Sequence, residues 1–168
     1  MIAILDAAYG NDTSAAACVT AEDWTSPKPL ADFSHRTGRA EEYRPGEFYR
    51  REMPLLQSVL RMLPERPAII VVDGYVWLDE DGRRGLGAHL FEALGGKVAV
   101  VGVAKTRFAD GQQYVERVLR GGSTSPLYVT TAGLTLSEAA SGVKRMHGDH
   151  RIPTLVGRAD SVARKALR

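Results

Sequence analysis

Hydrophobic residues at the beginning of the chain fall in three short runs, over residues 1–10, 15–24 and 28–37. The runs are rich in Ala, Val, Ile and aromatic residues, and the segments between them contain the Gly, Asn, Asp, Ser and Pro residues that form turns. Short strands joined by tight turns pair in the antiparallel sense. These runs therefore predict a three-stranded antiparallel meander.

The pattern then changes to that of helices alternating with buried strands. Residues 49–63 carry apolar side chains at helical spacing, and Pro64 predicts the end of this helix. Two continuous apolar runs, within residues 68–73 and 97–105, fit strands that are buried on both faces. The segment between them, residues 85–96, fits a short helix that ends in two glycines. Strand, helix and strand in this order predict a right-handed parallel crossover.

Three further elements complete the predicted fold. A strand is expected over residues 126–134, a helix that begins at Thr135 or Ser137, and a last helix at about 157–166. No repeat, low-complexity segment or linker interrupts the sequence. An antiparallel meander followed by βαβ units predicts one α/β domain over residues 1–168, with a mixed central sheet flanked by helices.

Composition adds little about function. With 168 residues and 44% apolar side chains, the chain is large enough for one hydrophobic core. A net charge of +2 is too small to indicate a nucleic-acid partner, and clustered arginines are ordinarily solvated faces or helix ends. The single cysteine, Cys18, excludes an internal disulfide and has no zinc-ligand spacing, and no apolar run has membrane-spanning length. We therefore expect a cytoplasmic protein with no membrane partner.

Two acidic residues follow predicted strands in a way that can build a site. Asp6 ends the first strand and Asp73 ends the first crossover strand, and ligands of open α/β sheets bind beyond the carboxyl ends of strands. Glu52 and Asp160 lie on helices that can bring further carboxylates there. Such acids stay ionised together only if cations share the site, and oxygen ligands favour Mg²⁺ or Mn²⁺, ions that support phosphodiester hydrolysis. Taken singly, each aspartate is more often a turn former or a helix cap.

Seven motifs occur in an order that is found in one known family. In chain order they are Asp6 on its strand, YRPGEFYRREMP (43–54), VVDG (71–74), GLGAHLF (85–91), GVAK (102–105), SPLYVTT (125–131) and RIPTLVGRAD (151–160). Together they resemble the endonuclease V family, which cleaves nucleic acid near deaminated adenine (inosine). The second motif is fairly specific, whereas VVDG and GVAK are weak alone. The resemblance covers nearly the whole chain.

The resemblance implies a ribonuclease H-like fold and a DNA-repair-type endonuclease that uses Mg²⁺ or Mn²⁺ to cut DNA or RNA near inosine. At this size we expect the protein to act as a monomer. Position by position, Asp6 and Asp73 match metal ligands, and Glu52 matches a ligand or a residue that positions the water. Asp160 completes the acidic ring, and Lys105 lies near the scissile phosphate, where it stabilises developing charge. Without the resemblance, a strand-end lysine that reaches solvent is the preferred interpretation of Lys105.

The resemblance also assigns residues to nucleic-acid binding. Tyr43 and the loop after it match the family's wedge, in which an aromatic ring takes the place of a lost stacking partner. Packing over the sheet edge is the alternative for this tyrosine. Arginines beside the wedge are expected to meet phosphates, and the segment after Asp73 is expected to line the base pocket. The residues in this set are Tyr43, Arg44, Pro45, Gly46, Arg51, Gly74 and Tyr75. His89 is expected to be structural.

Departures from the family keep other functions open. Relatives have Asp-Gly-His-Gly where this chain has Asp73-Gly74-Tyr75-Val76, and an acidic segment, WLDEDGRR, replaces a following His-Pro-Arg. Tyr75 and Trp77 would narrow the pocket, stack on a base or mark a different substrate, and the acidic residues disfavour a phosphate. The alternatives are therefore a metal-dependent nuclease or phosphoesterase of other specificity, and a non-catalytic nucleic-acid-binding relative.

Overall fold

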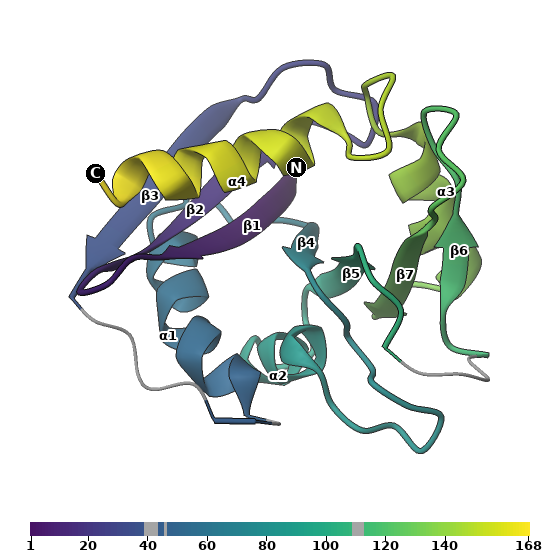
Figure 1. Ribbon diagram of the computed structural model, residues 1–168, viewed down its shortest axis with the longest axis horizontal. Coiled ribbons are helices and arrows are strands. Elements are labelled where there is room, and N and C mark those ends of the chain that lie inside the picture. The colour runs from purple at the N-terminus through teal and green to yellow at the C-terminus, as the bar shows by residue number, and fades with distance from the viewer. Residues whose placement is uncertain (39–43, 46, 109–112) are drawn as a thin grey trace.

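The computed structural model contains a mixed seven-stranded sheet within the residues that it describes, 1–38, 44–45, 47–108 and 113–168 (Figure 1). The strands are β1 (Ile2–Tyr9), β2 (Ser14–Ala21), β3 (Ala31–Thr37), β4 (Ile69–Asp73), β5 (Ala99–Ala104), β6 (Glu116–Val118) and β7 (Leu127–Ala132). Their order across the sheet is β3-β2-β1-β4-β5-β7-β6.

Strand directions agree with the predicted fold. β1, β2 and β3 form the antiparallel meander, and β1, β4 and β5 run parallel to one another. β7 pairs antiparallel with β5, and β6 pairs antiparallel with β7. The predicted α/β fold with a mixed sheet is thus confirmed. The sequence did not predict β6, because a strand of three residues is too short to show a periodic pattern.

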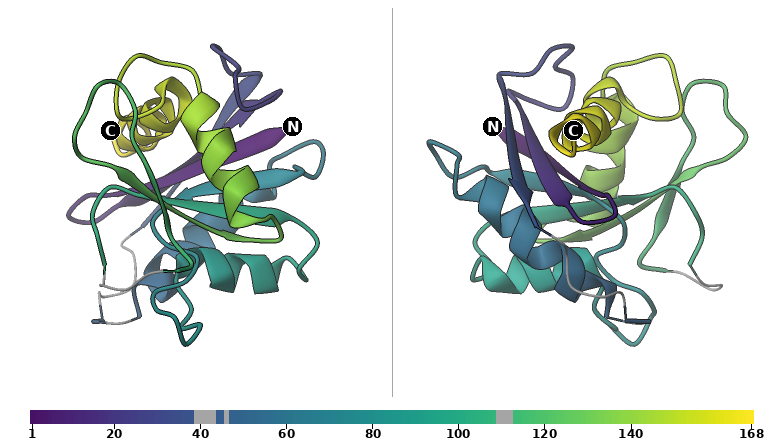
Figure 2. Two further views of the ribbon diagram at one scale, coloured as in Figure 1. Left: turned by 90° about the vertical axis from the view of Figure 1, so that its right-hand side faces the viewer. Right: turned by 60° about the vertical axis from the view of Figure 1, so that its left-hand side comes forward.

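Helices cover both faces of the sheet (Figure 2). α1 (Phe48–Leu60) and α2 (Leu86–Ala93) pack on one face, and α3 (Leu136–Arg145) and α4 (Thr154–Ala166) pack on the other. Thr135 caps α3 through a capping box with Glu138. α4 begins at Thr154, earlier than predicted, because Pro153 already occupies its N-cap position. Among the described residues, no helix has the length and apolar character that crossing a bilayer requires.

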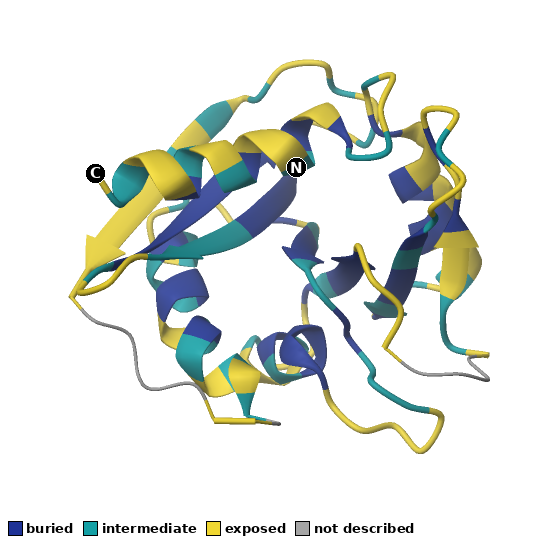
Figure 3. Cartoon of the chain, in the orientation of Figure 1, coloured by how far each residue is buried: buried dark blue, intermediate teal, exposed yellow. Residues whose placement is uncertain are grey.

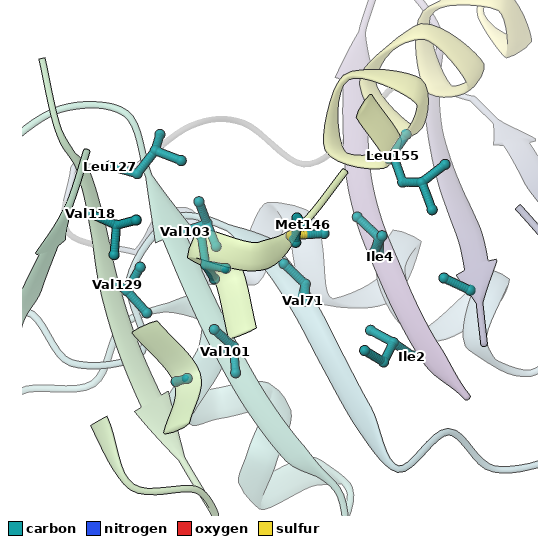
Figure 4. Close-up of a cluster of buried hydrophobic side chains, with 14 of the residues drawn as sticks. Ile2, Ile4, Val71, Val101, Val103, Val118, Leu127, Val129, Met146 and Leu155 are labelled. Atoms are coloured by element: carbon teal, nitrogen blue, oxygen red, sulfur yellow. The ribbon is translucent and has the colours of Figure 1, made fainter. Parts of the chain in front are cut away.

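Buried residues concentrate in the central strands and in the helices that pack on them (Figure 3). Alternation along the strands divides the buried side chains between two cores. Ile4 and Val71 point toward α3 and α4, where Leu155 packs with them (Figure 4). Leu5 and Val72, the next residues along the two strands, point toward α1 and α2. Successive side chains of a strand lie on opposite faces, so the central strands supply both cores. Cys18 is buried in β2 as a free thiol.

β1 lies within the predicted run 1–10, but Asp6, placed at the end of the strand from the sequence, lies inside it. Ala7, Ala8 and Tyr9 continue its pairing with β2. β4 ends at Asp73, and the last pair between β1 and β4 is Leu5 with Val72. Within the described chain, Ala7–Tyr9 therefore have no neighbouring strand on the side of β4.

Gly102 on β5 is closely packed against the backbone near Gly74 and the side chain of Thr130. A Cβ atom there would lie 2.5 Å from the Gly74 carbonyl oxygen and 2.7 Å from Thr130 Oγ1. We expect Gly102→Ala to lower the free energy of unfolding by about 2–3 kcal/mol, because backbone must move to admit the methyl group. The control is Gly157→Ala on α4, where the nearest atom is Ile152 Cγ2 at 3.9 Å. The control should raise the free energy of unfolding by about 0.5–1 kcal/mol. Urea unfolding measures both, and equal values for Gly102→Ala and wild type would contradict the packing.

Candidate active site

Asp6 and Asp73 lie beside each other on neighbouring parallel strands. Leu5 pairs with Val72, so the next row of the sheet places Asp6 next to Asp73. On each strand, the residue two positions earlier belongs to the core beneath α3 and α4. Because side-chain direction repeats every second residue, both carboxylates project toward the α4 side of the sheet. The two predicted ligands therefore share one face at one end of the sheet.

Lys105 continues β5 toward the two aspartates. Asp73 pairs with Val103, so Lys105, two residues further along, lies on the same face of the sheet. Its Nζ donates a hydrogen bond to Asp73 Oδ2 at 2.7 Å. Burial lowers the pKa of Lys105, but the hydrogen bond and charge of Asp73 outweigh it and raise the pKa above its usual value. The lysine is thus a stable positive charge beside the acids.

Glu52 enters the site from the opposite layer of helices. It lies on α1, and only 8% of the residue is exposed. Burial, followed by the negative charges of Asp6 and Asp73, raises the pKa of Glu52 to about 8, although Tyr9 and Arg51 lower it. A glutamate in this position keeps its proton near neutral pH unless a further positive charge approaches.

Asp6 interacts with acids from other elements. Burial and the charges of Asp73 and Asp160 raise the pKa of Asp6 to about 6, while the Ala7 N–H, which donates to Asp6 Oδ1 at 2.8 Å, lowers it. Asp160 lies on α4, and its Oδ1 accepts a hydrogen bond from Arg164 Nε at 2.8 Å. The fold thus brings together, from distant parts of the chain, the predicted catalytic residues Asp6, Glu52, Asp73, Lys105 and Asp160.

The side chains at this site are of the chemical type that binds a hard divalent cation. Asp6, Glu52 and Asp73 offer carboxylate oxygens, which Mg²⁺ and Mn²⁺ prefer. The raised pKa values of Asp6 and Glu52 are those of buried acids that lack compensating positive charge. In the structure Lys105 takes one oxygen of Asp73, and within the described ranges no three Asp, Glu, His or Cys side chains stand in metal-ligand geometry. Binding therefore requires these carboxylates to turn toward one another.

Tyr9 and Arg51 form a stacked pair next to Glu52. Arg51 Cζ lies 3.7 Å from the centroid of the Tyr9 ring. Arg51 Nε is buried with no hydrogen-bond partner in the described part of the chain, whereas the Tyr9 hydroxyl, also buried, interacts with the Glu52 carboxyl and lowers its pKa. Burial and the charge of Glu52 raise the pKa of Tyr9, so its phenol stays protonated. Arg51, predicted to meet phosphates, thus stacks on a ring. Tyr9 was not predicted as a site residue. Alternation along the strand from Asp6 places it on the face of the sheet covered by α1.

The predicted wedge is only partly included in the structure. Tyr43 and Gly46 lie outside the described residues, whereas Arg44 and Pro45 are exposed just before α1. Gly74, also predicted to bind nucleic acid, has a φ of 126° in the turn after β4. Glycine adopts this backbone conformation far more readily than other residues, which accounts for its presence there.

Tyr75, predicted to line the base pocket, packs its ring into the protein. The residue is only 8% exposed, and its hydroxyl donates to Thr106 O at 2.8 Å and accepts from the Phe108 N–H at 3.2 Å. Trp77 similarly donates its Nε1–H to Thr131 O at 3.0 Å. Burying the ring while satisfying its polar tip is favourable, so both aromatic residues stabilise backbone segments.

His89 makes a structural contact between α1 and α2. Its ring stacks on Tyr49 with 3.5 Å between the ring centroids and 15° between the planes. Burial and the charge of Arg84 lower the pKa of His89, so its imidazole stays neutral. This agrees with the structural role expected from the sequence.

Comparison with models of known families shows to which family the chain belongs. The family model described as Endonuclease V matches residues 1–161. The chain belongs to the endonuclease V family. A curated endonuclease V from Streptomyces avermitilis is 32% identical to it over 145 residues, which cover 75% of this chain and 62% of that protein. The alignment thus spans less than two thirds of the relative's length.

Solved endonuclease V structures have the same ribonuclease H-like fold. The crystal structure of endonuclease V from Streptomyces avermitilis matches with a TM-score of 0.83 and 27% identity, covering 99% of this chain and 80% of that one. Endonuclease V from Ciona intestinalis, in complex with a 24mer DNA containing an inosine followed by a ribo-adenosine, matches with a TM-score of 0.83 and 18% identity. That match covers 99% of this chain and 85% of the other.

Proposed function

We propose that this member of the endonuclease V family is a divalent-metal-dependent endonuclease that hydrolyses a phosphodiester bond near inosine in DNA or RNA. The observation that carries the proposal is the convergence of Asp6, Glu52 and Asp73, with Lys105 beside them. Like charges gathered in a partly buried place destabilise a fold. A bound cation explains why the chain keeps them together.

In this proposal Asp6, Glu52 and Asp73 would hold Mg²⁺ or Mn²⁺. When bound, such an ion activates a water molecule, orients the phosphate and offsets charge on the leaving oxygen. With Asp73 held by a cation, the Lys105 ammonium, which lies 2.7 Å from that carboxylate in the structure, would be free to donate to a phosphate oxygen. There it stabilises the negative charge that develops as the P–O bond breaks.

Glu52 and Asp160 support the two aspartates. A bound cation would lower the pKa of Glu52 from about 8, and the ionised carboxylate would then hold the cation or position the attacking water. Asp160, fixed by Arg164, adds negative charge that favours a cation close to Asp6. Both roles follow from side chains of this chain and require no rearrangement of the sheet.

Two observations bear on the substrate. The Ciona intestinalis endonuclease V was solved with an inosine-containing DNA, which supports a deaminated base as the target of a related fold. The burial of Tyr75, in the segment where family members carry histidine, favours a second candidate, a metal-dependent nuclease with another lesion specificity. Arg44 and Pro45, exposed before α1, remain available to contact either substrate.

A cleavage panel tests the proposal. Labelled oligonucleotides carry inosine in DNA or RNA, uracil, an abasic site or a mismatch, and each is incubated with Mg²⁺, Mn²⁺ or EDTA. We expect cutting of the inosine substrates with either metal and none with EDTA. Cutting confined to another lesion would establish the second candidate. Binding of oligonucleotides without cutting under every condition would identify a non-catalytic relative, and hydrolysis of only small phosphoesters would overturn the nuclease assignment.

A further inference from the structure

Arg151 binds three backbone carbonyls at the end of the sheet where Lys105 lies. Its Nη2 donates to Lys105 O at 2.5 Å and to Pro126 O at 2.9 Å, and its Nε donates to Ser125 O at 2.9 Å. Lys105 directly follows β5, and Ser125 and Pro126 directly precede β7. The guanidinium group thus ties the segment that leaves β5 to the segment that enters β7.

Strand pairing does not provide this restraint. The pairing of β5 with β7 ends at Ala104 and Tyr128, so it does not include Lys105. Pro126, near the same end of β7, has no N–H with which to extend the ladder. The Lys105 carbonyl instead accepts its hydrogen bond from Arg151. A planar guanidinium suits this task, because its several N–H groups point in fixed directions.

A second arginine holds the segment from which Arg151 projects. Arg120 is only 7% exposed, and its Nη1 donates to His150 O at 3.0 Å and to Arg151 O at 3.2 Å. Its Nη2 donates to Met146 O and, at 3.2 Å, to Gly148 O. The connection between α3 and α4 is therefore fixed at several carbonyls, and the base of the Arg151 side chain is fixed with it.

We propose that Arg151 is a positioning residue for Lys105: by holding the Lys105 carbonyl it sets where the lysine side chain begins and thereby where its ammonium meets Asp73 and the scissile phosphate. This inference rests on the proposed function, in which Lys105 stabilises charge on that phosphate. A lysine has a long flexible stem, so the position of its backbone limits which places the ammonium can reach. A misplacement of about 1 Å is enough to lower a rate by about 100-fold.

Steady-state kinetics of Arg151 variants test the inference. We expect Arg151→Ala to lower kcat by about 10- to 100-fold with little change in KM, because the phosphate still binds but the ammonium is misplaced. Arg151→Lys keeps the positive charge but cannot reach three carbonyls, so it should lose nearly as much. The matched control is Arg158→Ala, which removes an equal charge and breaks contacts of 2.5–3.0 Å with Asp32, far along the chain from Lys105. Its kcat should stay at the wild-type value, and an equal loss in this control would overturn the inference.

A double-mutant cycle separates this inference from the proposed function. If Arg151 acts through Lys105, then Arg151→Ala should cause no further loss of kcat in a Lys105→Ala background. An equal loss in both backgrounds would overturn the positioning role and leave the nuclease proposal intact. Wild-type activity in Lys105→Ala itself would remove Lys105 from the proposed mechanism, and the inference would fall with it.

A measurement without catalysis keeps the inference testable if the protein cuts no nucleic acid. Lysine side chains of the metal-free protein are acylated with an amine-reactive ester, and the rate at each lysine is followed by mass spectrometry. We expect Arg151→Ala to speed the labelling of Lys105, because its contact with Asp73 is loosened, and to leave the exposed Lys97 unchanged. Unchanged labelling of Lys105 would overturn the inference whatever the activity of the protein.

Discussion

Asp73→Asn is expected to lower the rate of strand cleavage by about 1,000-fold or more in the presence of Mn²⁺. The amide has the size of the carboxylate, but it carries no charge with which to hold a divalent cation next to Asp6. The side chains of Asp73 and Lys105 are 36% and 41% exposed, so loss of their ion pair should change the free energy of unfolding by at most about 1 kcal/mol. Single-turnover cleavage of an inosine-containing oligonucleotide, together with urea unfolding, measures both quantities.

The control for this variant is Asp12→Asn. Asp12 is exposed in the turn between β1 and β2, and the substitution removes the same charge away from the site. It should leave both the cleavage rate and the stability at wild-type values. If Asp73→Asn cleaves at a rate near that of the wild type, Asp73 is not a metal ligand and the proposed mechanism is wrong.

Glu52→Gln is expected to abolish cleavage and, at the same time, to stabilise the metal-free protein at alkaline pH. The native carboxyl has a pKa of about 8, whereas an exposed glutamate has its usual value of 4.5. The native state therefore binds the Glu52 proton more tightly than the unfolded state does. Stabilisation from this proton is complete below pH 4.5 and is lost as the pH rises toward 8, at up to about 1.4 kcal/mol per pH unit.

Glutamine removes this loss because it never has to ionise in its buried position. The free energy of unfolding of Glu52→Gln should exceed that of the wild type by a few kcal/mol at pH 8 and approach it near pH 5. Asp6, whose pKa is raised to about 6, causes a smaller decline in the free energy of unfolding at lower pH, and this decline is present in both proteins. Urea unfolding at several pH values in EDTA measures the difference, and wild-type stability that is flat from pH 5 to pH 8 would contradict it.

Addition of metal should make the wild type more stable than Glu52→Gln. A cation that binds only the native state stabilises it in proportion to its occupancy, so Mg²⁺ at pH 8 should stabilise the wild type and have little effect on Glu52→Gln. Glu65→Gln is the matched control, because Glu65 is exposed after α1 and its charge is solvated. This control should follow the wild type in stability, metal response and cleavage.

Local patterns were sufficient for most elements of the fold. Helical spacing before Pro64 and the continuous apolar run before Asp73 depend only on neighbours in the chain, and both predicted the element type correctly. The apolar run 1–10 predicted β1, but Asp6 was placed at the end of the strand, whereas the strand continues to Tyr9. Pairing with β2 holds the residues after Asp6 in the strand, and a polar residue inside the run does not reveal that pairing.

The chain by itself determined which acids are present, that Asp6 and Asp73 belong to buried strands, and which family the ordered motifs resemble. Only the tertiary structure decided that Glu52 is buried among them, that Tyr75 holds the 106–108 backbone, and that Arg151 reaches Lys105. Burial and electrostatic interaction depend on distances between residues far apart in sequence. Such distances arise only when strands pair in register and helices pack across them.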